Sequence, residues 1–403
     1  MRSTSCSILA QDVLDRCVAG KPPKELPRAL VEEPCGKALF GILAEGLADR
    51  FEAALCDAYA RLFSQAVAYA SPTLDAASLV ARYERIRRTR PVVGKPHRIF
   101  VLSRVTLGAD VAVTSVLLTA AKRRFSHAEV VFIAPRKNYE LFAGDPHIHH
   151  APIEYRRGSL GERLAVWDDL RTLLSAPDCI VVDPDSRLTQ LGLIPVCAEE
   201  RYHLFESRAY GADSNRNLSQ LAADWAAETF GTPGCRPYIA LGRKPARAPL
   251  VAVSLGVGEN PSKRLPDPFE VELFKMLSTL GTLCLDTGAG GEEAKRVEQA
   301  AKQAGIQPMF WEGSFAGFAA IITASSLYVG YDSAGQHVAA ACGIPLISIF
   351  AGFPVPRMFE RWRPVGPHCD VIRVDRSEVD GALRRVEDAV RRRMPRVETV
   401  AEG

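Results

Sequence analysis

The stretch Leu327-Tyr-Val-Gly-Tyr-Asp-Ser-Ala-Gly-Gln-His337 runs from a strand-like apolar segment into a small-residue helix, and it decides the class of fold. Earlier in the chain, Leu250-Val-Ala-Val-Ser-Leu-Gly-Val-Gly-Glu-Asn-Pro-Ser-Lys-Arg264 has a similar order of apolar residues, glycines, hydroxyl and cation. An open α/β sheet binds its ligand at the carboxyl ends of its strands. Free N–H groups and the positive end of a helix dipole there suit a phosphate. We therefore predict a nucleotide-diphosphate site in this half of the chain.

Strands and helices alternate from residue 97 onward. Continuous apolar strands are expected at 98–102, 129–134, 179–183, 250–255, 282–286, 327–330 and 344–350. Helical segments are expected between them, one of them at 162–174. The alternation restarts after a segment at 231–249 that is rich in Pro, Gly and Arg. Such a pattern is typical of parallel sheets covered by helices on both faces. It predicts an α/β protein with two Rossmann-like domains facing a cleft, at residues 96–235 and 236–375.

Residues 1–95 have the spacing of helices and precede the alternation. One apolar stripe at helical spacing contains Leu39, Leu43, Leu47, Phe51, Leu55, Tyr59 and Leu62. We expect a helical extension that is separate from the sheets. Residues 376–403 are predicted to form a C-terminal helix and tail, with Ser377 as the N-cap.

The bulk composition is that of an ordinary globular protein. The chain has 403 residues, 47% hydrophobic and 24% charged, and its net charge of +3 gives no reason to expect nucleic acid as a partner. Its ten cysteines contain no CxxC pair, so we expect reduced core thiols. Neither a signal peptide nor a membrane-spanning segment is recognised. We expect a cytoplasmic protein, with a peripheral position at the inner membrane left open.

Residues at three loops are candidates for chemistry. Asp110 begins a helix after the first strand, so its carboxylate can reach a sugar hydroxyl, cap the helix, or do both. Lys263 can neutralise a departing diphosphate, whereas as an exposed loop lysine it would only be solvated. Ser333 and the N–H groups after it can hold the diphosphate. A lone His337 at a helix start is often only a structural hydrogen-bonding group.

These loops resemble the motifs of glycosyltransferase family 9, the ADP-heptose:lipopolysaccharide heptosyltransferases, which have the GT-B fold. The family's Gly-Asp-Val turn and its flanking residues correspond to Arg104, Leu107, Gly108, Asp110, Val111 and Thr114. Its Pro-Ser-Lys-Arg-Trp-Pro loop is similar to Pro261-Ser-Lys-Arg-Leu-Pro266, and its Gly-Asn-Asp-Ser-Gly-Pro-Met-His turn to Gly330–His337. Gly288-Ala-Gly-Gly-Glu-Glu293 resembles the segment that meets the ribose in the family. The resemblance covers about residues 97–375.

The resemblance implies an inverting, metal-independent glycosyltransferase of the GT-B fold. It would move a heptose-like sugar from a nucleotide diphosphate, ADP-linked, to a hydroxyl of a glycan, lipid or protein. The implied catalytic residues are Asp110, as general base, and Lys263. The implied nucleotide-sugar-binding residues are Ser254, Gly256, Ser262, Arg264, Glu292, Glu293, Asp332, Ser333, Ala334, Gly335, Gln336 and His337. The implied acceptor side contains Arg104, Thr106, Gly108, Asp185 and Arg187. No metal and no cofactor is expected.

The chain departs from the family pattern in several places. Ala109 is inserted between the glycine and the acid, Leu255 replaces a proline, and Ala334 replaces a glycine. The N-terminal helical segment is absent from typical heptosyltransferases, and we expect it to build part of the acceptor site, to join subunits or to bind a partner. Two other functions stay open: a GT-B-fold nucleotide-sugar 2-epimerase, and a non-catalytic sugar-nucleotide-binding or scaffold protein.

Two further patterns resemble metal sites. Asp183-Pro-Asp185 has the form of the DxD motif of other sugar transferases, but a GT-B protein needs no such metal. His147, His149 and His150 lack an acid at ligand spacing, so we expect a surface cluster in a loop and no metal centre.

Overall fold

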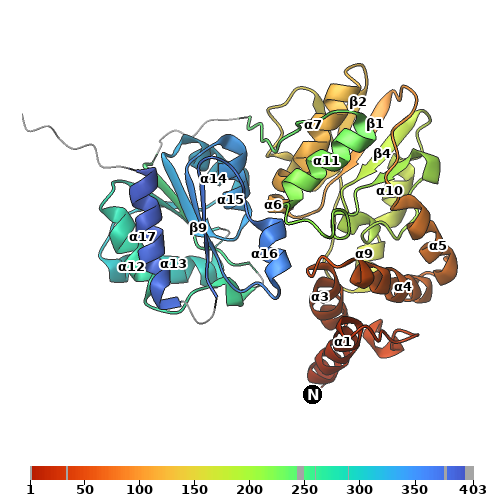
Figure 1. Cartoon of the computed structure of the whole chain (residues 1–403), viewed down its shortest axis with the longest axis horizontal. Coiled ribbons are helices and arrows are strands. Elements are labelled where there is room, and N and C mark those ends of the chain that lie inside the picture. Colours follow the sequence, from red (N-terminus) through yellow and green to blue (C-terminus); the bar gives the residue numbers. More distant parts are fainter. Residues whose placement is uncertain are drawn as a thin grey trace, which may run out of the picture. The chain divides into compact units, whose positions relative to one another are not determined.

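The computed structural model describes residues 2–32, 35–242, 249–258, 260–288, 290–375 and 379–394, and it divides into two compact units. The first unit contains Met1–Tyr139, Pro146–Pro237 and Pro354–Arg361, and the second contains Glu140–Asp145, Tyr238–Phe353 and Trp362–Gly403. Each unit has one parallel sheet (Figure 1), and each is described by itself below. No helix in the described ranges combines the length and the apolar character that crossing a membrane requires.

The predicted N-terminal helices are present in the first unit (red to brown in Figure 1). They are α1 (Arg2–Val18), η1 (Arg28–Leu30), α2 (Gly36–Ala38), the π-helical η2 (Leu39–Ala44), α3 (Glu45–Ala48), α4 (Ala53–Ala70) and α5 (Ala76–Ile86). The apolar stripe is interrupted at Phe51, which has a φ of 55° and lies between α3 and α4. Buried side chains of these helices, such as Phe63, share one hydrophobic cluster with sheet residues such as Val181. The extension is therefore packed onto the first sheet.

The structure corrects the prediction that all cysteines are reduced. Cys6 of α1 and Cys35, directly before α2, form a disulfide with their Cα atoms 5.4 Å apart. The other eight cysteines are free. The two partners are 29 residues apart in sequence and belong to no recognisable motif. Only the packing of α1 beside the η2 and α2 segment brings them together.

The first sheet has five parallel strands in the order β3-β2-β1-β4-β5. Its strands are β1 (Arg98–Leu102), β2 (Glu129–Ala134), β3 (Ile148–Pro152), β4 (Cys179–Asp183) and β5 (Tyr202–Leu204). Its helices are α6 (Leu107–Ala109), η3 (Asp110–Thr114), α7 (Ser115–Arg124), α8 (Arg136–Tyr139), α9 (Leu160–Leu164), α10 (Trp167–Leu173), η4 (Arg187–Thr189), η5 (Glu199–Arg201) and α11 (Leu218–Phe230). Four consecutive residues are apolar in each of the strands β1 (Ile99–Leu102) and β4 (Cys179–Val182), and this is why the sequence pattern revealed them.

Two local predictions for this unit were wrong. His149 and His150 lie in the edge strand β3 and not in a loop, because an edge strand is only partly buried and has no continuous apolar run. His150 Nε2 lies 2.9 Å from the carbonyl of Ala134 on the neighbouring strand. The helix expected to cover 162–174 is two helices, α9 and α10, and Ser159 caps the first of them in a capping box with Glu162.

The second sheet has six parallel strands in the order β11-β10-β9-β6-β7-β8. They are β6 (Val251–Ser254), β7 (Leu283–Asp286), β8 (Met309–Trp311), β9 (Leu327–Tyr331), β10 (Leu346–Phe350) and β11 (Cys369–Arg373). The helices are η6 (Pro261–Lys263), α12 (Phe269–Ser278), α13 (Gly291–Ala304), α14 (Phe315–Ala324), α15 (Ala334–Cys342), η7 (Val379–Gly381) and α17 (Ala382–Arg393). Sequence reasoning had not found β11, an edge strand with only one buried residue. Ser377, the expected N-cap of the last helix, lies outside the described residues.

One helix that follows the second sheet belongs to the first unit. In α16 (Pro356–Trp362), Arg361 is 1% exposed and donates hydrogen bonds to the carbonyls of Gly211, Ser214 and Arg216. Arg357 donates to the carbonyl of Phe51. The chain therefore returns to the first unit before it completes the second.

Candidate functional site

The carboxyl ends of the second sheet carry a row of polar or very small residues. In the strand register, Ser348 of β10 is opposite Gly330 of β9, Gly330 is opposite Ser254 of β6, and Asp286 of β7 is opposite Trp311 of β8. Ser254 Oγ donates to Asp286 Oδ2 at 3.0 Å, which links the two halves of the row. Register partners point to the same face of a sheet, so these side chains line one surface at the edge where such sheets bind ligands.

Lys263 and Asp332 join the two loops that were singled out from the sequence. Lys263 Nζ lies 2.7 Å from Asp332 Oδ2 and 3.1 Å from the Asp332 carbonyl oxygen. The carboxylate also accepts a hydrogen bond from Gln336, whose amide oxygen accepts one from Ser348. The lysine side chain is 19% exposed. The cation is thus held next to the start of α15 and still has an accessible surface.

The first turn of α15 packs closely on β9. A methyl group at Gly335 would lie 2.3 Å from Tyr328 Oη, and one at Gly330 would lie 2.5 Å from the Ser254 carbonyl oxygen. Ser333, the N-cap, has extended backbone and its side chain accepts no capping hydrogen bond. Ser333 and Ala334 are half-buried, whereas Gly335 is buried. The N–H groups of this turn therefore stand at the polar row without a side-chain cap.

His337 is a buried, neutral imidazole. Burial lowers the pKa of His337 to about 4, and the positive charge of Lys263 acts in the same direction while Asp332 opposes it. Its Nε2 lies 3.3 Å from Gln336 Nε2, and its ring centroid lies 5.9 Å from that of Trp362. At neutral pH this imidazole can donate or accept a hydrogen bond, but it adds no charge to the site.

Arg264 is engaged by acids and organises its own loop. Its Nε lies 3.1 Å from Glu270 Oε1 and its Nη2 lies 2.6 Å from Asp267 Oδ1. Glu270 is 1% exposed and also accepts hydrogen bonds from Arg296 and from Tyr331 at 3.2 Å. The structure therefore gives Arg264 a scaffold role that differs from the predicted nucleotide contact. Both acids lie within six residues of Arg264 in the sequence, but the spacing of the motif does not say whether the guanidinium turns toward them or toward a ligand.

Ser262 is exposed and is held within its own loop. Its Oγ donates to Asn260 Oδ1 at 2.5 Å and lies 3.2 Å from the carbonyl oxygen of Gly352. The contact with Gly352 brings the residues after β10 against the lysine loop.

The two candidate ribose acids have different surroundings. Glu292 is exposed and pairs with Lys295 at 2.8 Å. Glu293 lies over the glycine loops, since a methyl group at Gly256 would be 2.5 Å from Glu293 Oε1. Sequence reasoning missed Asp286 beside them. Burial raises the pKa of Asp286, and the charge of Glu293 adds to the increase. A signal for Asp286 existed, because it is the acid that directly ends a buried strand.

In the first unit, Asp110 is completely enclosed. It is 0% exposed and its carboxylate accepts hydrogen bonds from Ser103 Oγ at 2.6 Å, the Arg104 N–H at 2.7 Å, Thr114 Oγ1 at 2.7 Å and Asn138 Nδ2 at 2.6 Å. Burial raises the pKa of Asp110, and these four donors oppose the shift. The carboxylate ties the loop after β1 to η3 and α8. Gly108 is also buried, within α6.

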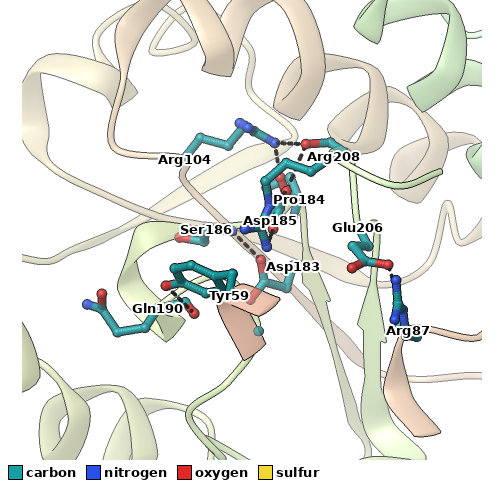
Figure 2. Close-up of polar contacts among 12 residues, drawn as sticks. Tyr59, Arg87, Arg104, Asp183, Pro184, Asp185, Ser186, Gln190, Glu206 and Arg208 are labelled. Atoms are coloured by element: carbon teal, nitrogen blue, oxygen red, sulfur yellow. Dashed lines mark hydrogen bonds and ion pairs between the residues drawn. The ribbon is translucent and has the colours of Figure 1, made fainter. Parts of the chain in front are cut away.

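The two acids of the Asp183-Pro-Asp185 motif are hydrogen-bonded to other groups of the protein. Asp185 accepts two hydrogen bonds from Arg208, at 2.8 and 2.9 Å, and a third from Ser207. The side chains of Asp185 and Arg208 are almost fully buried. Figure 2 shows this pair at the carboxyl end of β4, with Arg104 donating to the Pro184 carbonyl. Asp183 accepts from Ser186 N–H and from Thr189 Oγ1. These acids are structural.

The exposed part of the predicted acceptor side is a charged rim around Thr106. Arg187 Nη1 lies 3.3 Å from Thr106 Oγ1, and Arg157 donates to the Val105 carbonyl at 3.0 Å. Arg187 Nη2 lies 3.4 Å from Glu45 Oε1, on α3 of the N-terminal helices. Val105 has a φ of 62°, so the backbone of this loop is strained, as is often observed at functional sites. Within the described residues no group of three or more His, Cys, Asp or Glu side chains is arranged to hold a metal.

Comparison with known proteins extends this description. Residues 200–384 match the model of "Glycosyltransferase family 9 (heptosyltransferase)". E. coli heptosyltransferase WaaC, solved with ADP-2-deoxy-2-fluoro heptose, is 17% identical with a TM-score of 0.56, over 73% of this chain and 99% of that chain. E. coli ADP-heptose lps heptosyltransferase II is 20% identical with a TM-score of 0.52, over 73% and 98%. The family 9 glycosyl transferase from Veillonella parvula is 16% identical with a TM-score of 0.53, over 71% and 88%. Comparison with curated protein sequences gives no match.

The two parallel-sheet units and their likeness to these structures define the class of fold: the chain has the GT-B fold, as predicted. The resemblance to one family is confirmed as well. The family 9 model matches residues 200–384 of this chain, and the N-terminal helical extension lies outside the match. The matched region, 200–384, begins after the loop that holds Asp110.

Proposed function

We propose that the chain is an inverting, metal-independent glycosyltransferase that moves a heptose-like sugar from ADP to a hydroxyl acceptor. The observation that carries this proposal is the contact of Lys263 with Asp332 at the start of α15. It places a cation, an uncapped helix N-terminus and two small residues at the carboxyl edge of one sheet. Inversion and the ADP-heptose donor rest on the family resemblance.

The diphosphate would bind at the first turn of α15. The N–H groups after Ser333 point out of the helix start, and the helix dipole favours negative charge there. Lys263 would exchange its contact with Asp332 for the phosphate oxygens and would balance the charge that develops as the diphosphate leaves. Because His337 is neutral, with a pKa lowered to about 4, this balance would come from the lysine and the helix.

The nucleoside would lie toward β7 and α13. Glu293 faces the glycine loops at Gly256 and Gly288, and a carboxylate at this position can accept hydrogen bonds from ribose hydroxyls. Glu292 is placed in the solvent and would not contribute. Closure around the bound donor would exclude water, so that transfer outruns hydrolysis.

Asp110 would support the reaction as the residue that shapes the loop after β1. A carboxylate that already accepts four hydrogen bonds and has no exposed surface cannot take a proton from an acceptor hydroxyl without breaking that arrangement. As the general base that the family resemblance implies, Asp110 would have to give up one of these donors when the acceptor binds.

The test is a thermal-shift titration with ADP-, GDP-, UDP- and dTDP-sugars, followed by calorimetry with ADP. We expect the ADP-sugar to stabilise the protein most, and Lys263→Met to weaken ADP binding about 10- to 100-fold, the range of a charge-assisted hydrogen bond. Lys275→Met is the matched control, because Lys275 pairs with Glu272 on the exposed face of α12. Protection by none of the nucleotides, or unchanged ADP affinity in Lys263→Met, would refute the proposal.

A further inference from the structure

One row of residues at the carboxyl edge of the second sheet changes its chemistry from strand to strand. Gly330 of β9 is opposite Ser254 of β6, and the Ser254 hydroxyl donates to Asp286 of β7. Asp286 is in turn opposite Trp311 of β8, the edge strand. Neighbouring strands lie about 4.8 Å apart. In steps of that size the row presents no side chain, a hydroxyl, a carboxylate and an aromatic ring, and it leads away from the strand that α15 follows.

A nucleoside diphosphate carries its chemical groups in the same order. It has an anionic diphosphate, then a ribose with hydroxyl donors, then a flat base. With the diphosphate at the start of α15, the ribose would lie over β6 and β7 and the base at β8. A carboxylate accepts hydrogen bonds and donates none, so it suits a hydroxyl. An aromatic ring offers a flat apolar surface on which a base can stack.

Asp286 is held in place and can accept further hydrogen bonds. Its Oδ2 accepts from Ser254 Oγ at 3.0 Å, and its Oδ1 accepts from the Gly288 N–H at 2.9 Å. A carboxylate oxygen can accept more than one hydrogen bond, and this residue is only half-buried. The charge of Glu293 is near enough to help raise the pKa of Asp286. A ligand group that donates hydrogen bonds is therefore favoured beside these acids over one that is itself negative.

Trp311 is fixed at the end of the same row. Its Nε1 donates to the Ser314 carbonyl at 3.2 Å, and a methyl group at Gly313 would lie 3.3 Å from its Cζ2. The residue is half-buried, so part of it stays open to a ligand. Phe310, the residue before it in β8, is 47% exposed and points to the opposite face of the sheet, because side chains alternate along a strand.

We propose that Asp286 and Trp311 are specificity-determining residues for the nucleoside of the donor: the Asp286 carboxylate accepts a hydrogen bond from a ribose hydroxyl, and the Trp311 ring stacks on the base. This inference rests on the proposed function. It makes the site selective for ribonucleotides, because a deoxyribose lacks a hydroxyl donor and a phosphate on the ribose would meet the charge of the carboxylate.

The ribose contact is tested by calorimetry with ADP, 2′-deoxy-ADP and 3′-deoxy-ADP. We expect wild type to bind one of the two deoxy nucleotides about 10- to 100-fold more weakly than ADP, the range of a charge-assisted hydrogen bond. Asp286→Asn should lose a similar factor for ADP and should bind that deoxy nucleotide about as tightly as wild type does. Asp388→Asn is the matched control, because Asp388 is 52% exposed and its carboxylate lies 3.7 Å from Arg391 on the same helix, α17.

The base contact has its own readout. Trp311→Leu should weaken ADP binding about 10-fold, as expected for the loss of one stacked base. It should also remove the change in tryptophan fluorescence that ADP causes in wild type. Phe310→Leu is the matched control, since it replaces the neighbouring aromatic side chain on the opposite face of β8, and it should bind ADP as wild type does.

The outcomes separate the two proposals. If Lys263→Met weakens ADP binding while wild type binds ADP and both deoxy nucleotides equally well, the proposed function stands and the role of Asp286 is wrong. This comparison uses wild type, so it decides the ribose contact even if Asp286→Asn does not fold. Equal losses in Asp286→Asn for ADP and both deoxy nucleotides would show a structural role and would also overturn the assignment.

Two further results decide the remaining points. If Trp311→Leu binds ADP as tightly as Phe310→Leu does, the ring does not stack on the base. If wild type binds no nucleotide at all, the proposed function is wrong and the roles of Asp286 and Trp311 fall with it.

Discussion

The neutral His337 makes the stability of the second unit depend on pH. Burial lowers the pKa of His337 to about 4, from 6.5 in an exposed histidine. Between these values the unfolded chain binds a proton that the folded unit does not bind. Stability is therefore greatest above pH 6.5 and is lost as the pH falls toward 4. Replacing His337 with Gln should remove this loss.

The expected size follows from the two pKa values. A difference of 2.5 units corresponds to roughly 3 kcal/mol over the full range, and about 2 kcal/mol of this appears between pH 7 and pH 5. The pKa of His203 in the first unit is also lowered to about 4 by burial. His203 therefore adds a separate loss of stability in the first unit as the pH falls. His149, exposed on β3, is the control position.

The assay is urea unfolding at pH 7 and pH 5, followed by tryptophan fluorescence. Trp311 and Trp362 report on the second unit, and Trp167 and Trp225 report on the first. We expect wild type to lose about 2 kcal/mol more than His337→Gln in the transition of the second unit on going to pH 5. His149→Gln should follow wild type. Equal losses in wild type and His337→Gln would show that the imidazole is not buried as a neutral group.

Three further substitutions test the scaffold of the site. Glu270→Gln should lower the free energy of unfolding by about 3 kcal/mol, because it leaves two arginines without their buried acid. It should also weaken ADP binding by loosening the lysine loop. Thermal melting and calorimetry check the two effects, with exposed Glu272→Gln as the control. Asp185→Asn should lower the free energy of unfolding of the first unit by about 3–5 kcal/mol, since it leaves the Arg208 charge buried and unpaired; a loss below about 1 kcal/mol in urea unfolding would contradict the buried pair. Gly335→Ala should cost about 1–3 kcal/mol through overpacking and should reduce ADP affinity; an unchanged melting temperature would mean that α15 does not approach β9 this closely.

The sequence by itself determined the class of fold and the loops of the nucleotide-sugar side. Buried parallel strands are continuous apolar runs, so β1, β4, β6, β9 and β10 were visible as such. The lysine loop and the start of α15 follow two of these strands directly. Strands that are neighbours in a parallel sheet end at the same edge, and this is why the lysine loop and the start of α15 lie together, with Lys263 Nζ 2.7 Å from Asp332 Oδ2.

Only the tertiary structure decided what the individual charged groups do. The spacing of a motif does not contain the directions of its side chains. It could not say whether Arg264 faces a phosphate or Glu270, or whether Glu292 or Glu293 turns toward the glycine loops. Asp110 satisfied the motif, yet donors from Ser103 to Asn138 enclose it. Glu45 carried no motif at all, and it pairs with Arg187 because the extension packs on the first sheet. Local pattern fixes which backbone segments form strands and helices, whereas the burial of a charge and the choice of its partner depend on how the side chains pack in three dimensions.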